Sequence, residues 1–318
     1  MKVAFFAEGI AHGKIPRDYE NMRTDMAWIC ASDAIRIPYF ETKKLVEANE
    51  KFDVGVCIIP KRLDLGHKNH ALEQSDIPRI KQLCNKVVSM QEGPHWYFQD
   101  YALEQQIWYY NLLQEMDEIF VHNEQDAVYF RGLTGKPCKV MRTLMIEDTL
   151  KDIPLNNGEG VMIGGNFCQW YGGFDSYIVA QEFNEQIYIP SMGRKIPGEE
   201  QMENLTHLPY LKWNNWVAEL SKRKYAVHLM RTQAAGTFAL NCAYLGVPCI
   251  GYKGLDTQEI CHPLTSVSIG DLETAKELAH KLKTVPEFYK LCSETAIKRY
   301  KNEFSEQHWK KQFYENLR

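Results

Sequence analysis

The chain has 318 residues and a mass of 37.0 kDa, enough for two domains of ordinary size. Hydrophobic residues make up 45% of it and charged residues 25%, a balance that excludes a disordered protein. The formal net charge of −4 excludes a general electrostatic attraction to nucleic acid or to anionic lipid. The sequence contains no apolar run of about 18 residues, and Met1–Glu8 reaches a charge too early for a signal peptide. We therefore expect a cytoplasmic protein without membrane contact.

The nine cysteines do not form a recognisable disulfide or metal pattern. Their number is odd, and no two are spaced as CxxC or as in a zinc ribbon. Most lie in apolar strings, as Cys57 and Cys249 do. We expect reduced thiols in the core and no bound metal.

In the first half, short β-branched strings alternate with segments of helical period. The expected strands are 2–6, 53–60, 86–91, 118–122 and 138–144. The expected helices are 21–34, 76–84, 101–113 and 124–131. Alternation at this spacing predicts a parallel, doubly wound sheet.

A polar stretch at 151–159, which contains Pro, Asn and Gly, has the composition of a linker. After it the alternation resumes. The expected strands are 160–163, 186–191, 207–211, 225–230 and 247–252, and the expected helices are 174–183, 199–204, 215–222 and 237–245. Residues 272–318 are almost continuously helical in period, with breaks near Pro286 and Ser305.

These patterns predict an α/β protein of two Rossmann-like parallel-sheet domains that face a central cleft. The expected domains are residues 1–150 and 159–285, followed by C-terminal helices at 286–318.

Ligands of open parallel sheets bind beyond the carboxyl ends of the strands, and in the second half these ends are rich in glycine and cations. They are Gly164-Gly165-Asn166, Arg194-Lys195, and the segment from Arg231 to Thr237. Small residues bring backbone N–H groups close to a ligand, and a helix that begins at Thr237 would present a positive N-terminus. A plain helix cap is the alternative for the last segment alone, but three such ends on one edge favour an anion site. Neither GxGxxG after the first strand nor a GxxxxGK[ST] loop is present, which disfavours a nicotinamide dehydrogenase and a P-loop kinase.

Residues 207–264, with the run MRTQAAGTFALNCAYLGVPCIGYKGLDTQEI, resemble the donor half of the two-Rossmann (GT-B) nucleotide-sugar glycosyltransferases. The resemblance implies a nucleotide-sugar donor, UDP-linked, held by the second domain. It also implies that the C-terminal helices at 286–318 cross back and pack on the first domain. It assigns Arg231, Ala235, Gly236 and Thr237 to the diphosphate, Leu211 and Trp213 to the nucleobase, and Asp256, Thr257 and Gln258 to the sugar. The glutamate that the family carries at the end of the sugar loop has no clear counterpart, because Glu259 and Asp256 both qualify.

Residues 21–28 and 90–100 resemble, more faintly, the bacteriophage glycosyltransferases that modify hydroxymethylated pyrimidines of DNA. This resemblance implies that the first domain binds the acceptor, a hydroxymethylated base in double-stranded DNA. The protein would then act in the host cytoplasm. The acceptor-binding candidates are His12, Arg23, Asp25, Lys61, Arg62, Trp96 and Tyr97. The basic pair 61–62 has the alternative of an ordinary solvated surface.

Transfer to a hydroxyl needs a general base, and carboxylate or imidazole groups follow two strands of the first domain. Glu92 and His95 follow the expected strand 86–91, and Glu8 follows the first strand. Glu92 is the first candidate, with Glu8 in reserve and His95 beside it. The alternative for each is a hydrogen-bonded turn.

We therefore expect a glycosyltransferase that acts as a monomer without cofactor or metal, since the sequence has no DxD. Two other classes stay open. A sugar-nucleotide epimerase uses the same plan, and it would release no nucleoside diphosphate on addition of acceptor. A non-catalytic nucleic-acid binding module would bind DNA with a steep salt dependence.

Overall fold

The computed structural model describes residues 1–59, 72, 75–91, 93–155, 158–167, 171–190 and 195–318. The chain forms two compact units. Unit 1 contains Met1–Arg17, Met22–Thr143 and Trp309–Arg318, and unit 2 contains Asp18–Asn21 and Leu144–His308.

Unit 1 is built on a parallel sheet of six strands in the order β2-β1-β3-β4-β5-β6. The strands are β1 (Val3–Ala7), β2 (Ile35–Pro38), β3 (Phe52–Ile59), β4 (Cys84–Gln91), β5 (Glu118–Val121) and β6 (Cys138–Val140). β1 pairs with both β2 and β3, so the direction in which the chain adds strands reverses between β1 and β3.

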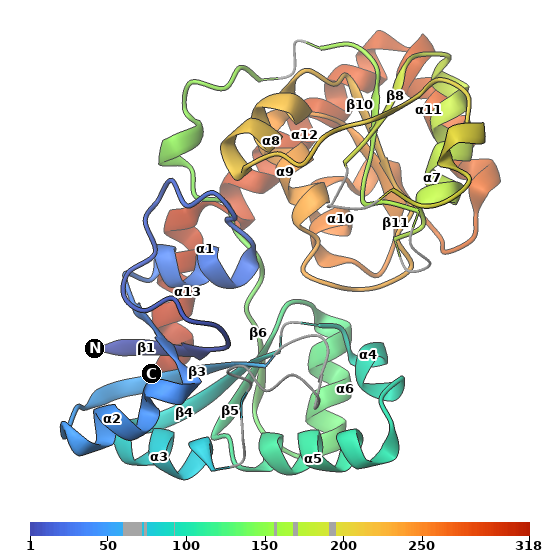
Figure 1. Ribbon diagram of the computed structural model, residues 1–318. Helices are drawn as coiled ribbons and strands as arrows, with labels where there is room; N and C mark the ends of the chain where they lie inside the picture. Colours follow the sequence, from blue (N-terminus) through green and yellow to red (C-terminus); the bar gives the residue numbers. More distant parts are fainter. Residues whose placement is uncertain (60–71, 73–74, 92, 156–157, 168–170, 191–194) are drawn as a thin grey trace. The chain divides into compact units, whose positions relative to one another are not determined.

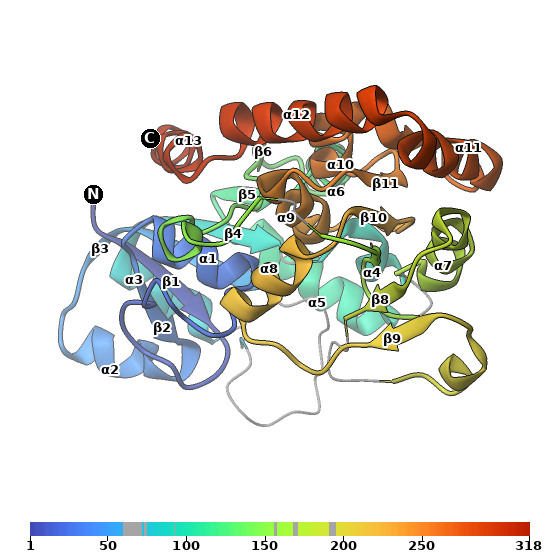
Figure 2. The ribbon, with the colours of Figure 1, turned by 90° about the horizontal axis from the view of Figure 1, so that it is seen from above.

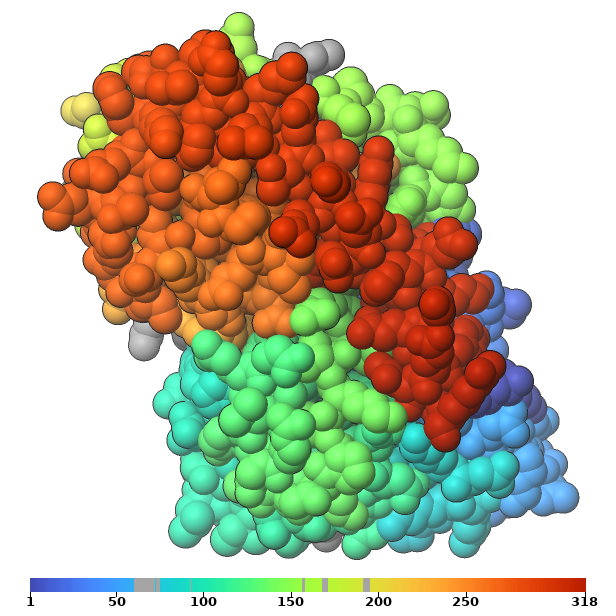
Figure 3. All heavy atoms as spheres, turned by 180° about the vertical axis from the view of Figure 1, so that it is seen from behind, coloured from blue at the N-terminus to red at the C-terminus, as the bar shows by residue number. Residues whose placement is uncertain are grey.

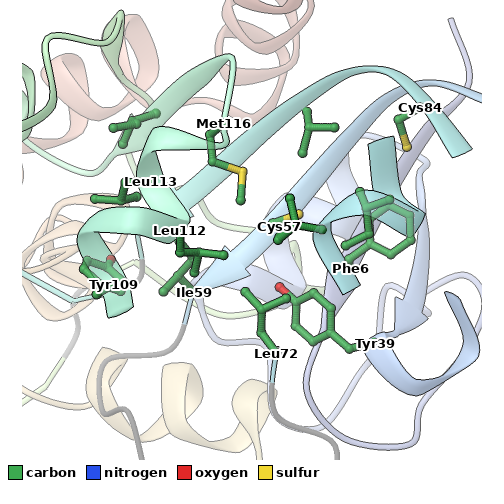
Figure 4. Packing of buried hydrophobic residues seen from close by; sticks show 14 of the residues in the cluster. Phe6, Tyr39, Cys57, Ile59, Leu72, Cys84, Tyr109, Leu112, Leu113 and Met116 are labelled. Atoms are coloured by element: carbon green, nitrogen blue, oxygen red, sulfur yellow. The ribbon is translucent and has the colours of Figure 1, made fainter. Parts of the chain in front are cut away.

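Helices cover both faces of this sheet (Figure 1). They are α1 (Thr24–Ala31), α2 (Thr42–Glu47), α3 (Asp76–Leu83), α4 (His95–Gln99), α5 (Leu103–Gln114), α6 (Glu124–Thr134) and α13 (Glu306–Leu317). One core packs the sheet against α3, α5 and α6, and Figure 4 shows Leu112, Leu113 and Met116 close to the β3 residues Cys57 and Ile59. Burial of these apolar side chains drives the association of sheet and helices.

The C-terminal helix α13 belongs largely to unit 1, although it ends the chain. Its Phe313 is fully buried and packs on Phe5 of β1 and Phe120 of β5. The indole Nε1 of Trp309 donates to the carbonyl of Arg142 at 2.9 Å. The outer side of α13 lies on the surface, in red in Figure 3. The spacing of its buried residues is therefore that of one apolar helix face.

Unit 2 repeats the design with a second six-stranded parallel sheet, in the order β12-β11-β10-β7-β8-β9. The strands are β7 (Val161–Ile163), β8 (Ile187–Ile189), β9 (Leu205–His207), β10 (Tyr225–His228), β11 (Cys249–Tyr252) and β12 (Ser266–Val267). Here the direction reverses between β7 and β10, which are hydrogen-bonded neighbours.

Two helical layers cover the unit 2 sheet. The helices are α7 (Gly173–Ala180), α8 (Trp213–Ser221), α9 (Thr237–Leu245), α10 (Asp256–Cys261), α11 (Leu272–Thr284) and α12 (Pro286–Glu303). One core contains residues of α8, α9, α10 and α12, and the other contains residues of α7 and α11. Figure 2 shows α12 running along α9 and α10.

The predicted fold class, an α/β protein of two Rossmann-like parallel-sheet domains, is confirmed. Two short edge strands, β2 and β12, were not expected from the sequence. β9 ends at His207, where the prediction placed its start, because Pro209 has no N–H to continue the ladder. Within the described ranges, no helix is long and apolar enough to cross a membrane.

The expectation that all of residues 286–318 pack on the first domain is wrong for α12. This helix lies in unit 2, where its Ala296 and Tyr300 are buried in the core shared with α9. Only Trp309–Arg318 belongs to unit 1. The boundary between the units also falls after Thr143, ahead of the linker expected at 151–159.

Candidate functional site

The strand order of unit 2 reverses where β7 and β10 adjoin, and this is the edge at which a ligand is expected. In open parallel sheets, the carboxyl ends of the strands at such a reversal leave room for a ligand. Gly164 follows β7 directly, and its N–H donates to the carbonyl of Val227 in β10 at 2.9 Å. Two of the segments predicted to form an anion site, the one at Gly164 and the one from Arg231 to Thr237, thus follow adjacent strands.

A buried histidine fills the space beside Gly164. A Cβ added to Gly164 would lie 2.5 Å from Cγ of His228 and 2.7 Å from a ring carbon of Phe238, in the first turn of α9. His228 is 7% exposed, and neither ring nitrogen has a hydrogen-bond partner in the described part of the chain. Burial lowers the pKa of His228 to about 4, so the ring is neutral at pH 7. Only glycine fits at position 164.

The N-terminus of α9 is shaped by Gly236, which has φ +71°. Thr257 of α10 donates its hydroxyl to the carbonyl of Gly236 at 2.9 Å, and a Cβ on Gly236 would lie 2.0 Å from that hydroxyl oxygen. The structure therefore brings together two of the predicted donor segments. Thr237, the first residue of α9, is exposed, and the N–H groups of the first helical turn have no partners within the helix.

Arg231 stands at the same edge with most of its side chain in solvent. This side chain is 64% exposed, and its Nη2 lies 3.4 Å from Oδ2 of Asp175, in the first turn of α7. The hydroxyl of Tyr252 donates to the same carboxylate oxygen at 3.3 Å. A long, exposed ion pair of this kind leaves the guanidinium available to an incoming anion.

The other predicted donor residues differ in exposure. Gly165 has φ +73°, Asn166 is buried, Ala235 is half-buried and Lys195 is exposed. Arg194 lies outside the described residues.

The predicted base-binding segment lies at the start of α8. The N–H of Trp213 donates to the carbonyl of Glu20 at 2.8 Å, and Lys212 forms an ion pair with Glu20. The indole Nε1 of Trp213 is buried without a partner among the described residues, whereas Leu211 is half-buried.

Of the predicted sugar-loop residues, Asp256 is half-buried, while Thr257 and Gln258 point inward and are each 1% exposed. The amide of Gln258 donates to the carbonyl of Cys249 at 2.9 Å. These two side chains hold the loops of the edge together.

A cavity of about 650 Å³ lies at the opposite ends of the same strands. Glu185, Tyr188, Lys224 and Tyr289 contribute to its wall. It contains none of the predicted donor residues. Across the described ranges, no group of three His, Cys, Asp or Glu side chains could hold a metal ion.

In unit 1 the reversal between β1 and β3 places the loop that contains Glu8 and His12 at the corresponding edge. Arg36 of β2 is buried, and its guanidinium donates to the carbonyls of Glu8 and Ala11. Gly13 forms a backbone bridge with Arg36. The loop is thus fastened to β2.

Two of the predicted acceptor-binding residues, Arg23 and Asp25, form an ion pair with each other a few residues after this loop. Arg23 binds Asp25 through two contacts of 2.8 Å, and the Asp25 side chain is 1% exposed. His12 Nδ1 lies 2.6 Å from Oε2 of Glu41. All three residues stay candidates for acceptor binding.

His95 begins α4, after β4, and it is paired with a residue that the sequence did not indicate. Its Nδ1 lies 2.7 Å from Oδ1 of Asp126, in the first turn of α6. The rings of Trp96 and Tyr97 stack on each other with centroids 4.1 Å apart. Three further candidates, Glu92, Lys61 and Arg62, lie outside the described residues.

The sequence analysis did not predict three residues of these edges: His228, Arg36 and Asp126. His228 could have been found from its place at the end of a strand that leads into Arg231. For Asp126 the signal is the Asn123-x-x-Asp spacing of a helix start. Arg36, inside a short apolar strand, gives no signal.

No protein-family model matches the chain, and no curated protein matches it by sequence. Solved structures match it over its whole length. HepE of Anabaena in complex with UDP-glucose has a TM-score of 0.67 and 11% identity, covering 100% of this chain and 99% of HepE. An alpha-glucosyltransferase in complex with UDP and a 13-mer DNA containing an HMU base has a TM-score of 0.64 and 11% identity, and the match covers 100% of this chain and 99% of that one. Sucrose-phosphate synthase of Thermosynechococcus elongatus has a TM-score of 0.61 and 13% identity, and the match covers 99% of this chain and 98% of the synthase.

At 11–13% identity these likenesses show the fold. The resemblance to two-domain glycosyltransferases of the GT-B type expected from the sequence is confirmed at that level. The alpha-glucosyltransferase crystallised with DNA is among the proteins that share the fold.

Proposed function

We propose that the protein is a glycosyltransferase that moves a sugar from a UDP-linked donor to an acceptor hydroxyl. Unit 2 binds the donor and unit 1 binds the acceptor. The observation that carries the proposal is the edge of the unit 2 sheet, where exposed Arg231 and the N-terminus of α9 follow a strand adjacent to β7. HepE, which shares the fold, was crystallised with UDP-glucose, and this supports a UDP-sugar as the donor.

In this proposal the chain's own groups stabilise the leaving UDP. The guanidinium of Arg231 offers two parallel N–H donors to a phosphate, and the first turn of α9 adds backbone N–H groups and the positive end of its dipole. Preorganised donors of this kind stabilise the charge that develops on a leaving group. The transfer then requires no metal ion or other cofactor.

We further propose that the acceptor is the hydroxymethyl group of a modified pyrimidine in double-stranded DNA. The alpha-glucosyltransferase crystallised with DNA containing an HMU base, matched over the full length of both chains, supports this acceptor. The protein would work as a monomer in the cytoplasm, or in the host cytoplasm if a phage encodes it.

Thermal unfolding with UDP and with UDP-glucose tests the donor. At a hundred times the dissociation constant a bound ligand adds about 2.7 kcal/mol of stability, so either compound should raise the melting temperature. Release of UDP from UDP-glucose only when HMU-containing duplex is added then separates transfer from epimerisation. Absence of any thermal shift with both compounds would contradict the proposal.

A further inference from the structure

The pair formed by His95 and Asp126 is fixed more firmly than a surface ion pair. Asp126 is 2% exposed, and its Oδ1 accepts hydrogen bonds from both Nδ1 of His95, at 2.7 Å, and the backbone N–H of His95, at 2.8 Å. Its Oδ2 accepts from the amide of Asn123 at 2.8 Å. The carboxylate therefore has no freedom to turn away from the imidazole.

The same carboxylate is tied into the start of α6. Asn123, the N-cap of that helix, is fully buried and accepts from the backbone N–H of Asp126 at 2.9 Å. The ring of Tyr129, one turn further along α6, stacks on the His95 imidazole with centroids 4.8 Å apart. Three groups from α6 thus set the position and plane of one imidazole.

This arrangement decides which nitrogen can take up a proton. Because Oδ1 of Asp126 is an acceptor, Nδ1 of His95 carries the hydrogen, and the lone pair stands on Nε2. The His95 side chain is 22% exposed, so part of the ring is open to solvent. Asp126 and Tyr129 are the titratable groups that face the imidazole from α6 within the described residues, and α4 itself has no charged residue. Burial raises the pKa of Tyr129, which keeps its hydroxyl neutral.

We propose that His95 is the general base of the transfer and that Asp126 is its positioning residue, a role that rests on the proposed function. Nε2 takes the proton of the acceptor hydroxyl as the hydroxyl oxygen forms its bond to C1 of the sugar. The bond from C1 to the β-phosphate oxygen breaks, and its electron pair stays on UDP. The carboxylate of Asp126 offsets the positive charge of the resulting imidazolium.

The test is the pH dependence of kcat for UDP release from UDP-glucose, with HMU-containing duplex and with water as acceptors. The wild type should lose activity at low pH, where Nε2 is protonated, and this fall in kcat is the acid limb of the pH profile. His95→Gln should lower kcat by about 10²–10⁴-fold and remove this acid limb. Asp126→Asn should lower kcat less and move the limb to lower pH, because the imidazolium loses its compensating charge.

His207 provides a matched control, since its Nδ1 lies 2.6 Å from a buried carboxylate oxygen of Glu199 in unit 2. His207→Gln should keep both kcat and the acid limb. A purely structural pair at His95 would change the melting temperature and leave the midpoint of the limb where it is, which would overturn the proposal.

Nitrogen NMR of the wild-type imidazoles gives a second readout that needs no acceptor. Hydrogen on Nδ1 of His95 is expected, and hydrogen on Nε2 alone would overturn the proposal. The proposed function and the role of His95 can be refuted separately. A protein that binds neither UDP nor UDP-glucose refutes the proposed function, whereas donor turnover with a fully active His95→Gln variant refutes only the base.

Discussion

The carboxyl-end edges of the two sheets are built from different chemical groups. In unit 2 the edge combines glycine backbone with a cation: Gly164 admits the His228 ring, Gly236 precedes α9, and the exposed Arg231 side chain lies beside them. In unit 1 the edge contains pairs of side chains, and in the pair of His95 and Asp126 the carboxylate is buried. Backbone N–H groups suit a phosphate, which needs many donors and no proton transfer. A held imidazole suits a hydroxyl, which must lose a proton.

The largest expected effect concerns the core of unit 1. Phe313→Ala should destabilise this unit by about 3–5 kcal/mol, because a fully buried ring between Phe5 and Phe120 leaves a cavity when removed. Chemical denaturation followed by tryptophan fluorescence measures the loss. Lys311, whose side chain is 75% exposed in the same helix, gives the control variant Lys311→Ala with unchanged stability. A loss of less than about 1 kcal/mol for Phe313→Ala would show that α13 is dispensable to unit 1.

Acid should affect unit 2 through two buried histidines. Burial lowers the pKa of His228 and of His262 from 6.5 to about 4, so the unfolded chain binds their protons more readily. Stability should therefore fall as the pH drops from 6.5 towards 4, by up to about 3 kcal/mol for each histidine, and it should stay constant for these groups above pH 7. Denaturation midpoints across this range measure the effect.

His228→Phe separates the two histidines, because it keeps a ring beside Phe238 and removes the titrating group. The variant should lose roughly half of the acid sensitivity. An unchanged pH profile would assign the acid loss to other groups.

Arg231→Ala tests the donor edge directly. Removal of one electrostatic stabiliser of the leaving UDP should lower kcat by about a hundredfold or more. The fold should survive, since the Arg231 side chain is 64% exposed. Lys290→Ala, at a position 75% exposed on α12, should keep full activity. Wild-type donor binding and turnover in a variant that lacks both Arg231 and Arg194 would show that the donor edge is misplaced.

The smallest expected change in stability comes from a pair of glycines with nearly the same backbone. Gly236 has φ +71° and Gly135 has φ +67°, but only at Gly236 would a Cβ meet another atom. Gly135→Ala should cost about 1 kcal/mol of strain. Gly236→Ala should cost about 1–3 kcal/mol and remove the stabilisation by UDP, because the α9 N-terminus shifts. Equal UDP-dependent thermal shifts in both variants would place the anion site elsewhere.

Most of the regular structure could be predicted from the sequence. Helix α9 begins and ends at the predicted residues, since Gly236 and Gly246 flank an apolar helical run. The breaks of the C-terminal helices near Pro286 and Ser305 were also predicted, because proline cannot continue a helix interior. The short strand β2 was missed, because it contains a buried arginine whose partners are backbone carbonyls of a distant loop.

The candidate site was less predictable than the fold. Glycines and cations after strands predicted the edge that is proposed to bind the donor, because strand ends can be read from local pattern. The pairing of His95 with Asp126 could not be predicted, since the partners lie 31 residues apart and meet only when β4 and β5 pair. The inward turn of Thr257 and Gln258 depends likewise on packing between α9 and α10.

The sequence by itself determined the two Rossmann-like halves, because alternation of β-branched and amphipathic segments is a local property that fixes a parallel sheet. It also determined which segments follow the strands, and hence which residues can reach a ligand. Only the tertiary structure decided that α12 packs on unit 2 while α13 packs on unit 1. Both helices carry an apolar face, and which surface such a face covers depends on contacts between residues far apart in the chain.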